Sequence, residues 1–405
     1  MRRKVVFAGA YGIQNAGDDA PLLVLTRALR EAHPAVDFDF AVLARHPDPL
    51  LAEAAGARFV PNPEYPSRAL AAGKFFRGLN PGDDRGDLER LEDEIRTADL
   101  VIAGAGNALV DLALGLFRGP VPLLALYAFL ADLHATPLFL YGISAGPLAT
   151  ERGRELSAWI VRRAAAVTVR DAASRALLEE LAPGVSVRVL PDPVLGLEPA
   201  SDAAFERALE RERIPRRSDR PRLALALRDL SFLGFDRASV VAALRALAPR
   251  FELLFVSQCT DRECDDRLEA EAVIRDLHGA RCHVVRERHA PDVLQRFFEL
   301  AEVTLAVRLH GAVFSAMAGV PVVALSYLPK VRGFLERVGL ERGVHELTSA
   351  TPQALCASIE AARDVDRAAL RRRVRGLAAG TAEYAAIAAR LLEPRALAYS
   401  ASSKQ

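Results

Sequence analysis

The sequence is poor in cysteine, with only four in 405 residues: Cys259, Cys264, Cys282 and Cys356. The first two are too widely spaced for the usual zinc knuckle, and no second pair follows them. So few cysteines in so long a chain suit a reducing cytosol. The sequence contains no cluster of metal ligands, and we predict that the protein uses no metal.

Neither basic nor acidic side chains are in excess. The 53 basic and 52 acidic side chains leave a formal net charge of +1. A protein that binds nucleic acid would need a local basic patch, because this overall balance provides no attraction to a polyanion. We therefore predict that nucleic acid is not a partner.

No apolar run is long enough to cross a membrane. The longest, Val121 to Ala131, is interrupted by Asp132 and His134, which predicts a buried helix. The opening MRRKVVFAGAYGI has too short an apolar stretch for a signal peptide, and polar residues follow it at once. We read this stretch as a first strand and expect a soluble protein of the cytoplasm.

The two common nucleotide-binding fingerprints are absent. The glycines of residues 10–17 (AYGIQNAG) do not fit G-x-G-x-x-G, and the chain has no G-K-[ST]. Asp18 and Asp19 then open an amphipathic helix to about Ala32, where their carboxylates offset the helix dipole. The loop is either a tight strand-to-helix turn or a backbone that approaches a ligand, with Asn15 and Asp18 as polar contacts.

Strands and helices alternate along the whole chain, which argues for parallel sheets covered on both faces. A polar, charged segment interrupts this alternation and marks a domain boundary. We predict an α/β protein of two Rossmann-like domains that face a central cleft. The predicted parts are a first domain at 1–196, a linker at 197–220, a second domain at 221–380, and a C-terminal helix and tail at 381–405.

Each predicted strand is short and apolar. In the first half they are Lys4–Gly9, Phe38–Leu43, Leu100–Ala103, Leu138–Gly142, Ala166–Val169 and Val187–Leu190, and in the second half Leu223–Leu227, Leu253–Val256, Cys282–Val285, Val303–Val307 and Val322–Leu325. Residues 61–87 are rich in Pro, Gly and charge, and we expect an excursion at the surface there. This excursion could form a lid or be only a surface loop.

The stretch from residue 301 to 330 carries the strongest functional signal. Arg308 and His310 follow one strand directly, a short helix comes next, and Tyr327 and Lys330 follow the second strand. If the two strands are parallel neighbours, these side chains share the carboxyl edge of one sheet, where open α/β sheets bind ligands. A helix N-terminus with two cations and a histidine suits an anionic substrate and proton transfer.

Other predicted strands also end in polar or glycine residues that suit close approach to a ligand. We expect substrate contacts from Gly104, Gly106, Asn107, Ser144 and Arg170 in the first half, and from Arg228 and Gln258 in the second. A cleft between two such domains is the default place for a ligand.

The chain resembles the polysaccharide pyruvyl transferase family. The resemblance runs through GAYGIQNAGDDAPL (9–22), VIAGAGNALVD (101–111), YGISAGPL (141–148), VTVRDAAS (167–174), LPDPVL (190–195), and R-L-H-G through S-Y-x-x-K (308–330). The family usually has three glycines where this chain has Gly104-Ala105-Gly106, and often an Asp-Glu pair where it has Asp18-Asp19. The functional positions of the family fall on His310, Arg308, Arg170 and Lys330.

The resemblance implies a fold of the two-domain GT-B type. It also implies transfer of the enolpyruvyl unit of phosphoenolpyruvate to a sugar diol of a cell-surface polysaccharide or its precursor, which gives a pyruvate ketal and phosphate. Arginine suits the carboxylate and the phosphate of this donor, and histidine can move the protons. The chemistry needs no cofactor. The acceptor is a glycan, free or lipid-linked, and a lipid-linked one would bring the enzyme to the inner face of the membrane.

Two other functions remain open. A nucleotide-sugar glycosyltransferase would use the same cleft, although no acidic residue in the second half is clearly placed to hold a ribose diol. A catalytically silent sugar- or phosphate-binding relative would keep the fold alone, but this chain retains all four candidate residues.

Overall fold

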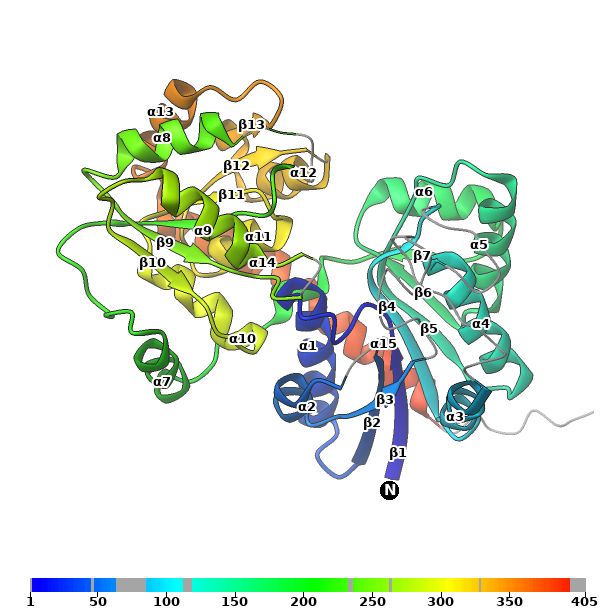
Figure 1. Cartoon of the computed structure of the whole chain (residues 1–405). Coiled ribbons are helices and arrows are strands. Elements are labelled where there is room, and N and C mark those ends of the chain that lie inside the picture. Colours follow the sequence, from blue (N-terminus) through cyan, green and yellow to red (C-terminus); the bar gives the residue numbers. More distant parts are fainter. Residues whose placement is uncertain are drawn as a thin grey trace, which may run out of the picture.

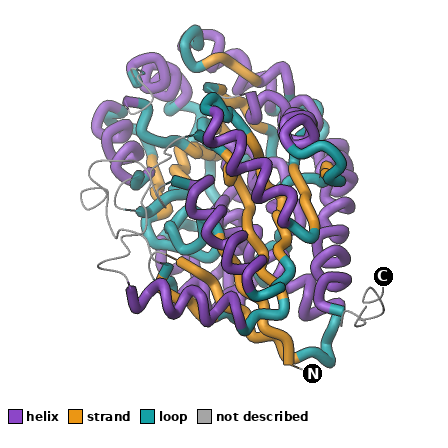
Figure 2. The backbone as a smooth tube through the Cα atoms, turned by 90° about the vertical axis from the view of Figure 1, so that its right-hand side faces the viewer, coloured by secondary structure: helices purple, strands orange, loops and turns teal. Residues whose placement is uncertain are grey.

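The computed structural model describes residues 2–44, 47–62, 85–111, 119–231, 235, 237–261, 264–327 and 329–393. It contains two α/β units, each built on one parallel sheet (Figure 1). The first sheet has the strand order β3-β2-β1-β4-β5-β6-β7 and the second the order β10-β9-β8-β11-β12-β13. Helices lie on both sides of the strands (Figure 2). The predicted fold class is confirmed.

The strands are β1 (Arg2–Ala8), β2 (Asp37–Ala44), β3 (Arg58–Pro61), β4 (Leu100–Leu109), β5 (Leu138–Ala145), β6 (Ala166–Val169), β7 (Val187–Val189), β8 (Arg222–Ala226), β9 (Glu252–Val256), β10 (Cys282–Val285), β11 (Val303–Ala306), β12 (Val322–Ser326) and β13 (Val344–Glu346).

The α-helices are α1 (Ala16–Ala32), α2 (Pro49–Ala55), α3 (Arg85–Arg96), α4 (Pro120–Leu133), α5 (Glu151–Arg163), α6 (Ala172–Leu181), α7 (Asp202–Glu212), α8 (Ala238–Leu247), α9 (Asp266–Asp276), α10 (Pro291–Leu294), α11 (Leu309–Met317), α12 (Pro329–Val338), α13 (Pro352–Ala362), α14 (Arg367–Ala378) and α15 (Ala382–Leu392). The 3₁₀ turns are η1 (Pro193–Gly196), η3 (Gln295–Leu300), η4 (Glu341–Gly343) and η5 (Ala379–Thr381).

The observed elements depart from the predicted ones at several places. The strands β4 and β5 run further than expected, so Gly104, Gly106, Asn107 and Ser144 lie inside strands and not after them. The strands β3 (RFVP) and β13 (VHE) were not predicted, because charged or polar residues leave neither as a continuous apolar run. Most of the expected excursion, residues 63–84, lies outside the described residues.

The expected linker contains a folded helix. Phe205 of α7 is fully buried, and its ring packs edge-on against Phe297 at a centroid distance of 5.3 Å. At the end of the chain, α15 returns to the first sheet, where Tyr384 packs edge-on against Tyr141 at 4.8 Å. The first unit is therefore completed by the last helix, and the exact domain boundaries stay a prediction.

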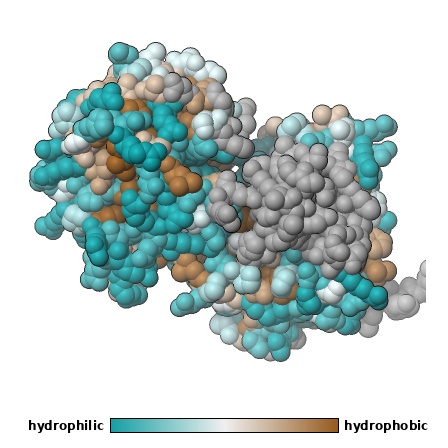
Figure 3. Space-filling model, in the orientation of Figure 1, coloured by the Kyte–Doolittle hydropathy of each residue, from teal (hydrophilic) through white to brown (hydrophobic). Residues whose placement is uncertain are grey.

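One apolar core passes through both units. It joins Val5 and Phe7 of β1 to Ala224 of β8 and Val256 of β9, with α1, α11, α14 and α15 between. One further apolar cluster fills the outer face of the first sheet, and another fills the outer face of the second. Hydrophilic residues cover much of the visible outer surface of the second unit (Figure 3). None of the described helices is both long and apolar enough to span a bilayer.

A backbone strap ties the two units together. Ala16 donates its N–H to the Gln258 carbonyl at 2.9 Å, and Thr260 donates to the Gln14 carbonyl at 3.0 Å. Between them Asn15 and Cys259 form an isolated antiparallel bridge. Cys259 is also joined to Cys264 by a disulfide, a pairing that the low cysteine count did not suggest. The loop that begins α1 is thus fixed against the second unit.

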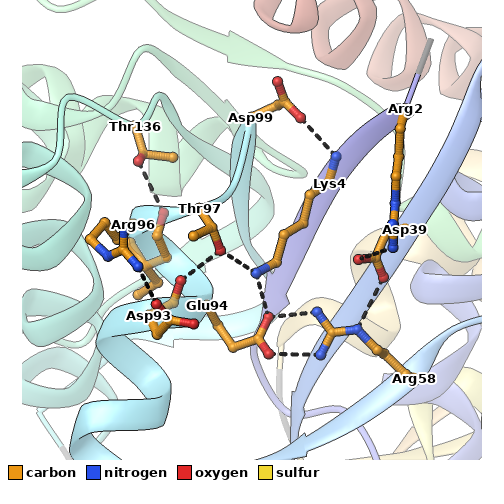
Figure 4. Close-up of polar contacts among 11 residues, drawn as sticks. Arg2, Lys4, Asp39, Arg58, Asp93, Glu94, Arg96, Thr97, Asp99 and Thr136 are labelled. Carbon is orange, nitrogen blue, oxygen red and sulfur yellow. Dashed lines mark hydrogen bonds and ion pairs between the residues drawn. The ribbon is translucent and has the colours of Figure 1, made fainter.

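An ionic network lies at the edge of the first sheet where its strands begin (Figure 4). Arg58 donates to both carboxylate oxygens of Glu94 at 2.7 and 2.6 Å, and Asp99 accepts the backbone N–H of Lys4 at 2.7 Å. Burial alone would raise the pKa of Glu94, but the hydrogen bonds from Arg58 and Lys4 outweigh it and lower the pKa. These charges are matched within the protein and hold β1, β3 and α3 together.

Candidate active site

The carboxyl edge of the second sheet places His310 at the start of a helix. The strands β11 and β12 are parallel neighbours, as predicted. Arg308 is the N-cap residue of α11, with extended φ and ψ of −83° and 136°, and His310 is the second residue of the helix. The free N–H groups of this first turn therefore open on the same edge as the histidine.

Arg308 is held by a buried carboxylate. Its Nε and Nη2 both donate to Oδ1 of Asp266, at 3.0 and 2.6 Å, and the Asp266 side chain is 3% exposed. The other oxygen of Asp266 accepts the N–H groups of Gln258 and Cys259. Burial raises the pKa of Asp266 even though the Arg308 charge opposes this. Arg308 is thus fixed in place, and most of its charge is compensated.

Lys330 approaches the same edge from α12. Burial lowers the pKa of its ammonium group, and the nearby Arg170 lowers it further. Next to it, Arg228 donates from Nη1 to the Tyr327 hydroxyl at 2.8 Å and lies over the Tyr327 ring, 5.6 Å from its centre. The structure therefore brings Lys330, Arg228 and Tyr327 together after β8 and β12.

Arg170 occupies the facing edge of the first sheet. It follows β6, and its guanidinium donates to Ser144 Oγ at 2.7 Å, to Asp192 Oδ2 at 2.8 Å, and to Asn107 Oδ1 at 3.3 Å. Asn107 and Ser144 are register partners on neighbouring strands. Three acceptors from separate segments thus orient this arginine, and its side chain is only 10% exposed.

The first turn of α1 lies against the histidine. Asn15 caps the helix by accepting the Gly17 N–H at 3.2 Å. A Cβ on Gly17 would collide with Nδ1 of the His310 ring. A Cβ on Gly106 would lie 3.7 Å from an oxygen of Asp18, so these two residues face each other across the same space. The N-terminal loop of one unit therefore forms a wall for the histidine of the other.

The electrostatic couplings join both halves of the site. Burial lowers the pKa of His310, Asp192 and Asp18 act to raise it, and Arg170 and Lys330 act to lower it. Burial would raise the pKa of Asp192, but Arg170 and His310 outweigh this and lower it. His310 is therefore neutral near pH 7. The nearby cations and carboxylates influence its pKa, and its own charge influences the pKa of Asp192.

Two residues that we expected to contact a ligand, Gly104 and Gln258, are packed against other parts of the protein. A Cβ on Gly104 would lie 2.1 Å from the Tyr141 carbonyl oxygen, so Gly104 serves close packing inside the sheet. The Gln258 amide is buried beside Gly311, and its carbonyl belongs to the strap between the units. Both were selected because they follow predicted strands, and their roles as ligand contacts stay predictions.

Two carboxylates of the site were missed by the sequence reasoning. Asp192 follows β7 at the same edge as Arg170, a position that could have identified it. Asp266 is the first residue of α9, ten residues after its strand ends, and nothing in the sequence connects it with Arg308. Within the described ranges, no group of three His, Cys, Asp or Glu side chains is arranged to hold a metal ion.

The fold matches those of solved proteins, among them one bound to UDP-GlcNAc and one bound to UDP and glucose. UDP-GlcNAc 2-epimerase from Neisseria meningitidis, solved with UDP-GlcNAc, aligns with a TM-score of 0.58 and 13% identity over 97% of this chain and 99% of its own. HepE from Anabaena, solved with UDP and glucose, aligns with a TM-score of 0.61 and 12% identity over 96% and 99%. At such low identity the likeness establishes the two-domain GT-B-like fold alone.

The sequence comparisons identify the family. The amylovoran biosynthesis protein AmsJ of Erwinia amylovora is 23% identical over 307 residues, which are 68% of each chain. The sequence pattern of the polysaccharide pyruvyl transferases matches residues 15–329, a range that holds Asn15, Arg170, Arg308 and His310. This range covers most of the chain and confirms the predicted resemblance. The protein is a transferase and belongs to the polysaccharide pyruvyl transferase family.

Proposed function

We propose that the enzyme transfers the enolpyruvyl unit of phosphoenolpyruvate to a sugar diol of an exopolysaccharide or its precursor, forming a pyruvate ketal and releasing phosphate. The observation that carries this proposal is the coupling of His310 to Arg170 and Lys330. A neutral histidine between two cations suits an anionic donor that must exchange protons. The relation to AmsJ, an amylovoran biosynthesis protein, supports an exopolysaccharide product.

The donor binds through Arg170 and Lys330 in this proposal. The two cations lie close enough that Arg170 lowers the pKa of Lys330, and an anion between them relieves that repulsion. The hydrogen bond from Arg170 to Asn107, at 3.3 Å, is the longest that this side chain makes. We expect Arg170 to replace it with a hydrogen bond to a charged oxygen of the donor. Arg308 has two of its five N–H donors committed to Asp266, so it contributes through the other three and the helix N-terminus.

His310 acts as the base that activates the acceptor. The methylene carbon of phosphoenolpyruvate gains one proton, which leaves an electron-poor centre at the carbon bearing the phosphate. A sugar hydroxyl attacks that carbon and loses its proton to His310. The second hydroxyl then replaces the phosphate, so two hydroxyl protons leave, one becomes part of the methyl group, and one departs with phosphate. The lowered pKa of His310 keeps the accepting form present at neutral pH.

The direct test is release of phosphate from phosphoenolpyruvate in the presence of free and lipid-linked glycan acceptors. We expect release that depends on an acceptor and falls at least ~100-fold in His310→Gln. His278→Gln changes an exposed histidine and serves as the control. Carried out in heavy water, the reaction should place one deuterium in the ketal methyl group. Undiminished activity of His310→Gln would remove the histidine from the mechanism.

HepE, solved with UDP and glucose, shares this fold, so a nucleotide-sugar glycosyltransferase stays a competing function. Thermal shift separates the two. Stabilisation by phosphoenolpyruvate but not by UDP-sugars supports pyruvyl transfer, and the reverse supports the glycosyltransferase. Vesicles that carry a lipid-linked acceptor test whether the enzyme works at a membrane face.

A further inference from the structure

A cavity of about 290 Å³ lies beside the candidate active site. It is lined by Phe235, Ser326, Tyr327, Glu346, Leu347 and Thr348. Ser326 and Glu346 are the last residues of the neighbouring parallel strands β12 and β13, and Phe235 comes from the segment after β8. The cavity therefore opens on the carboxyl edge that also carries His310, and Figure 1 places α12 on the side of the second unit nearest the first.

Tyr327 belongs to both the cavity and the charged site. Its hydroxyl accepts a hydrogen bond from Arg228, which follows β8 at the same edge of the sheet. Lys330 follows three residues later, at the start of α12. A molecule in the cavity would therefore lie next to the cations that we assign to the donor.

The lining has two chemical sides. Phe235, Tyr327 and Leu347 pack against the apolar cluster of the second unit and form an apolar wall. Ser326, Glu346 and Thr348 supply hydroxyl and carboxylate oxygens. Pyranose rings have the same two sides, since their C–H faces pack on aromatic rings and their hydroxyl edges bind oxygen acceptors.

The described lining residues offer no free charge for an anionic occupant. Glu346 is the charged residue among the lining side chains, and its oxygen binds Arg332 at 2.6 Å. This ion pair leaves no unpaired charge among the described lining residues, so nothing in the lining attracts a phosphate or diphosphate.

We propose that this cavity is the acceptor subsite and binds an uncharged pyranose ring of the glycan, with Phe235 and Tyr327 as its platform. The role of the bound sugar as acceptor rests on the proposed function, whereas binding of the glycan itself does not. The sugar diol reaches the donor carbon from the side of Tyr327 and Lys330. Glu346 binds the hydroxyls that do not react.

Blocking the cavity tests the assignment. Thr348 is an exposed lining residue, so Thr348→Trp fills the space without disturbing the core, and Ser349→Trp places the same ring on an exposed neighbour outside the lining. With the whole protein, we expect Thr348→Trp to raise the acceptor KM at least ~10-fold while the KM for phosphoenolpyruvate stays within ~2-fold. Phe235→Leu should raise the acceptor KM as well, and Ser349→Trp should not.

A binding measurement separates this inference from the proposed function. Saturation-transfer NMR with a panel of uncharged methyl pyranosides should show transfer to ring protons that is lost in Thr348→Trp. Binding of this kind without phosphate release would support the subsite and reject pyruvyl transfer. Pyruvyl transfer with an unchanged acceptor KM in Thr348→Trp would reject the subsite. Displacement of the pyranosides by UDP at the cavity would also overturn it, in favour of a nucleotide.

Discussion

Gly17 has no side chain where the ring of His310 needs space. Gly17→Ala adds one methyl group at the second residue of α1, where helical backbone accepts alanine, so the effect is a collision with His310. We expect at least a ~10-fold loss of kcat/KM with little change in the melting temperature. The control is Gly376→Ala in α14, where a Cβ meets nothing within 4 Å. Equal activity of both variants would contradict the contact.

The pH dependence of activity can be assigned residue by residue. A base must be neutral, so activity should fall as the pH drops through the pKa of His310, which burial places below 6.5. Lys330 lowers that pKa and Asp18 raises it. In Lys330→Gln the acid limb of kcat/KM should therefore move to higher pH, and in Asp18→Asn to lower pH. Shifts in the same direction in both variants would show that the limb belongs to another group.

At the scale of elements, the last helix supports the first sheet. The Tyr384 hydroxyl donates to the Pro191 carbonyl at 2.7 Å, directly before Asp192, and a Cβ on Gly142 would lie 3.2 Å from the same hydroxyl. We expect Tyr384→Phe to cost about 1 kcal/mol of stability and Tyr384→Ala about 3–5 kcal/mol, measured by denaturant unfolding. Unfolding that is unchanged in Tyr384→Ala would mean that α15 can leave the sheet freely.

The element scale also shows what the sequence could predict. Strands such as Ala166–Val169 and Cys282–Val285 were predicted to the residue, because β-branched residues gather in each and an arginine follows each directly. The extension of β4 through Gly104 to Asn107 was not, because glycine is a poor strand former alone and is accepted here by close packing on Tyr141. Packing against a distant strand has no local signature.

The residues of the candidate site likewise divide into those that the sequence could indicate and those that it could not. Arg170, Arg308, His310 and Lys330 follow strands or open helices, and topology brings such positions to one edge. Their roles stay a prediction that the proposed assays test. The carboxylates that orient them, Asp192 and Asp266, depend on side-chain contacts between segments 22 and 42 residues apart. Sequence spacing alone carries no information on those contacts.

At the scale of the whole molecule, a buried charge group lies where the two units meet. Asp19 of α1 is 1% exposed and accepts hydrogen bonds from the Gly12 N–H and from Arg288 of the second unit, at 2.9 and 3.0 Å. Arg288 also pairs with Asp48. Burial raises the pKa of Asp19 to about 8, although Arg288 opposes the shift. One guanidinium therefore serves two buried carboxylates.

This group should make stability depend on pH. Folded Asp19 keeps its proton up to pH of about 8, whereas the unfolded residue releases it near 3.8, so the unfolded chain binds fewer protons between these values. The contribution of Asp19 to stability must then fall as the pH rises from 4 to 8. Asp19→Asn removes this term, so its melting temperature relative to the original protein should rise over that range. A constant difference would show that Asp19 stays ionised.

The apolar core shared by the two units has an evolutionary consequence. Val5, Phe7, Ala224 and Val256 belong to one cluster, closed by a helix from the end of the chain. Neither half could be exchanged for that of a relative without mismatched packing along this whole seam. Recombination that joins one half of this chain to the other half of a relative would therefore leave few folded descendants.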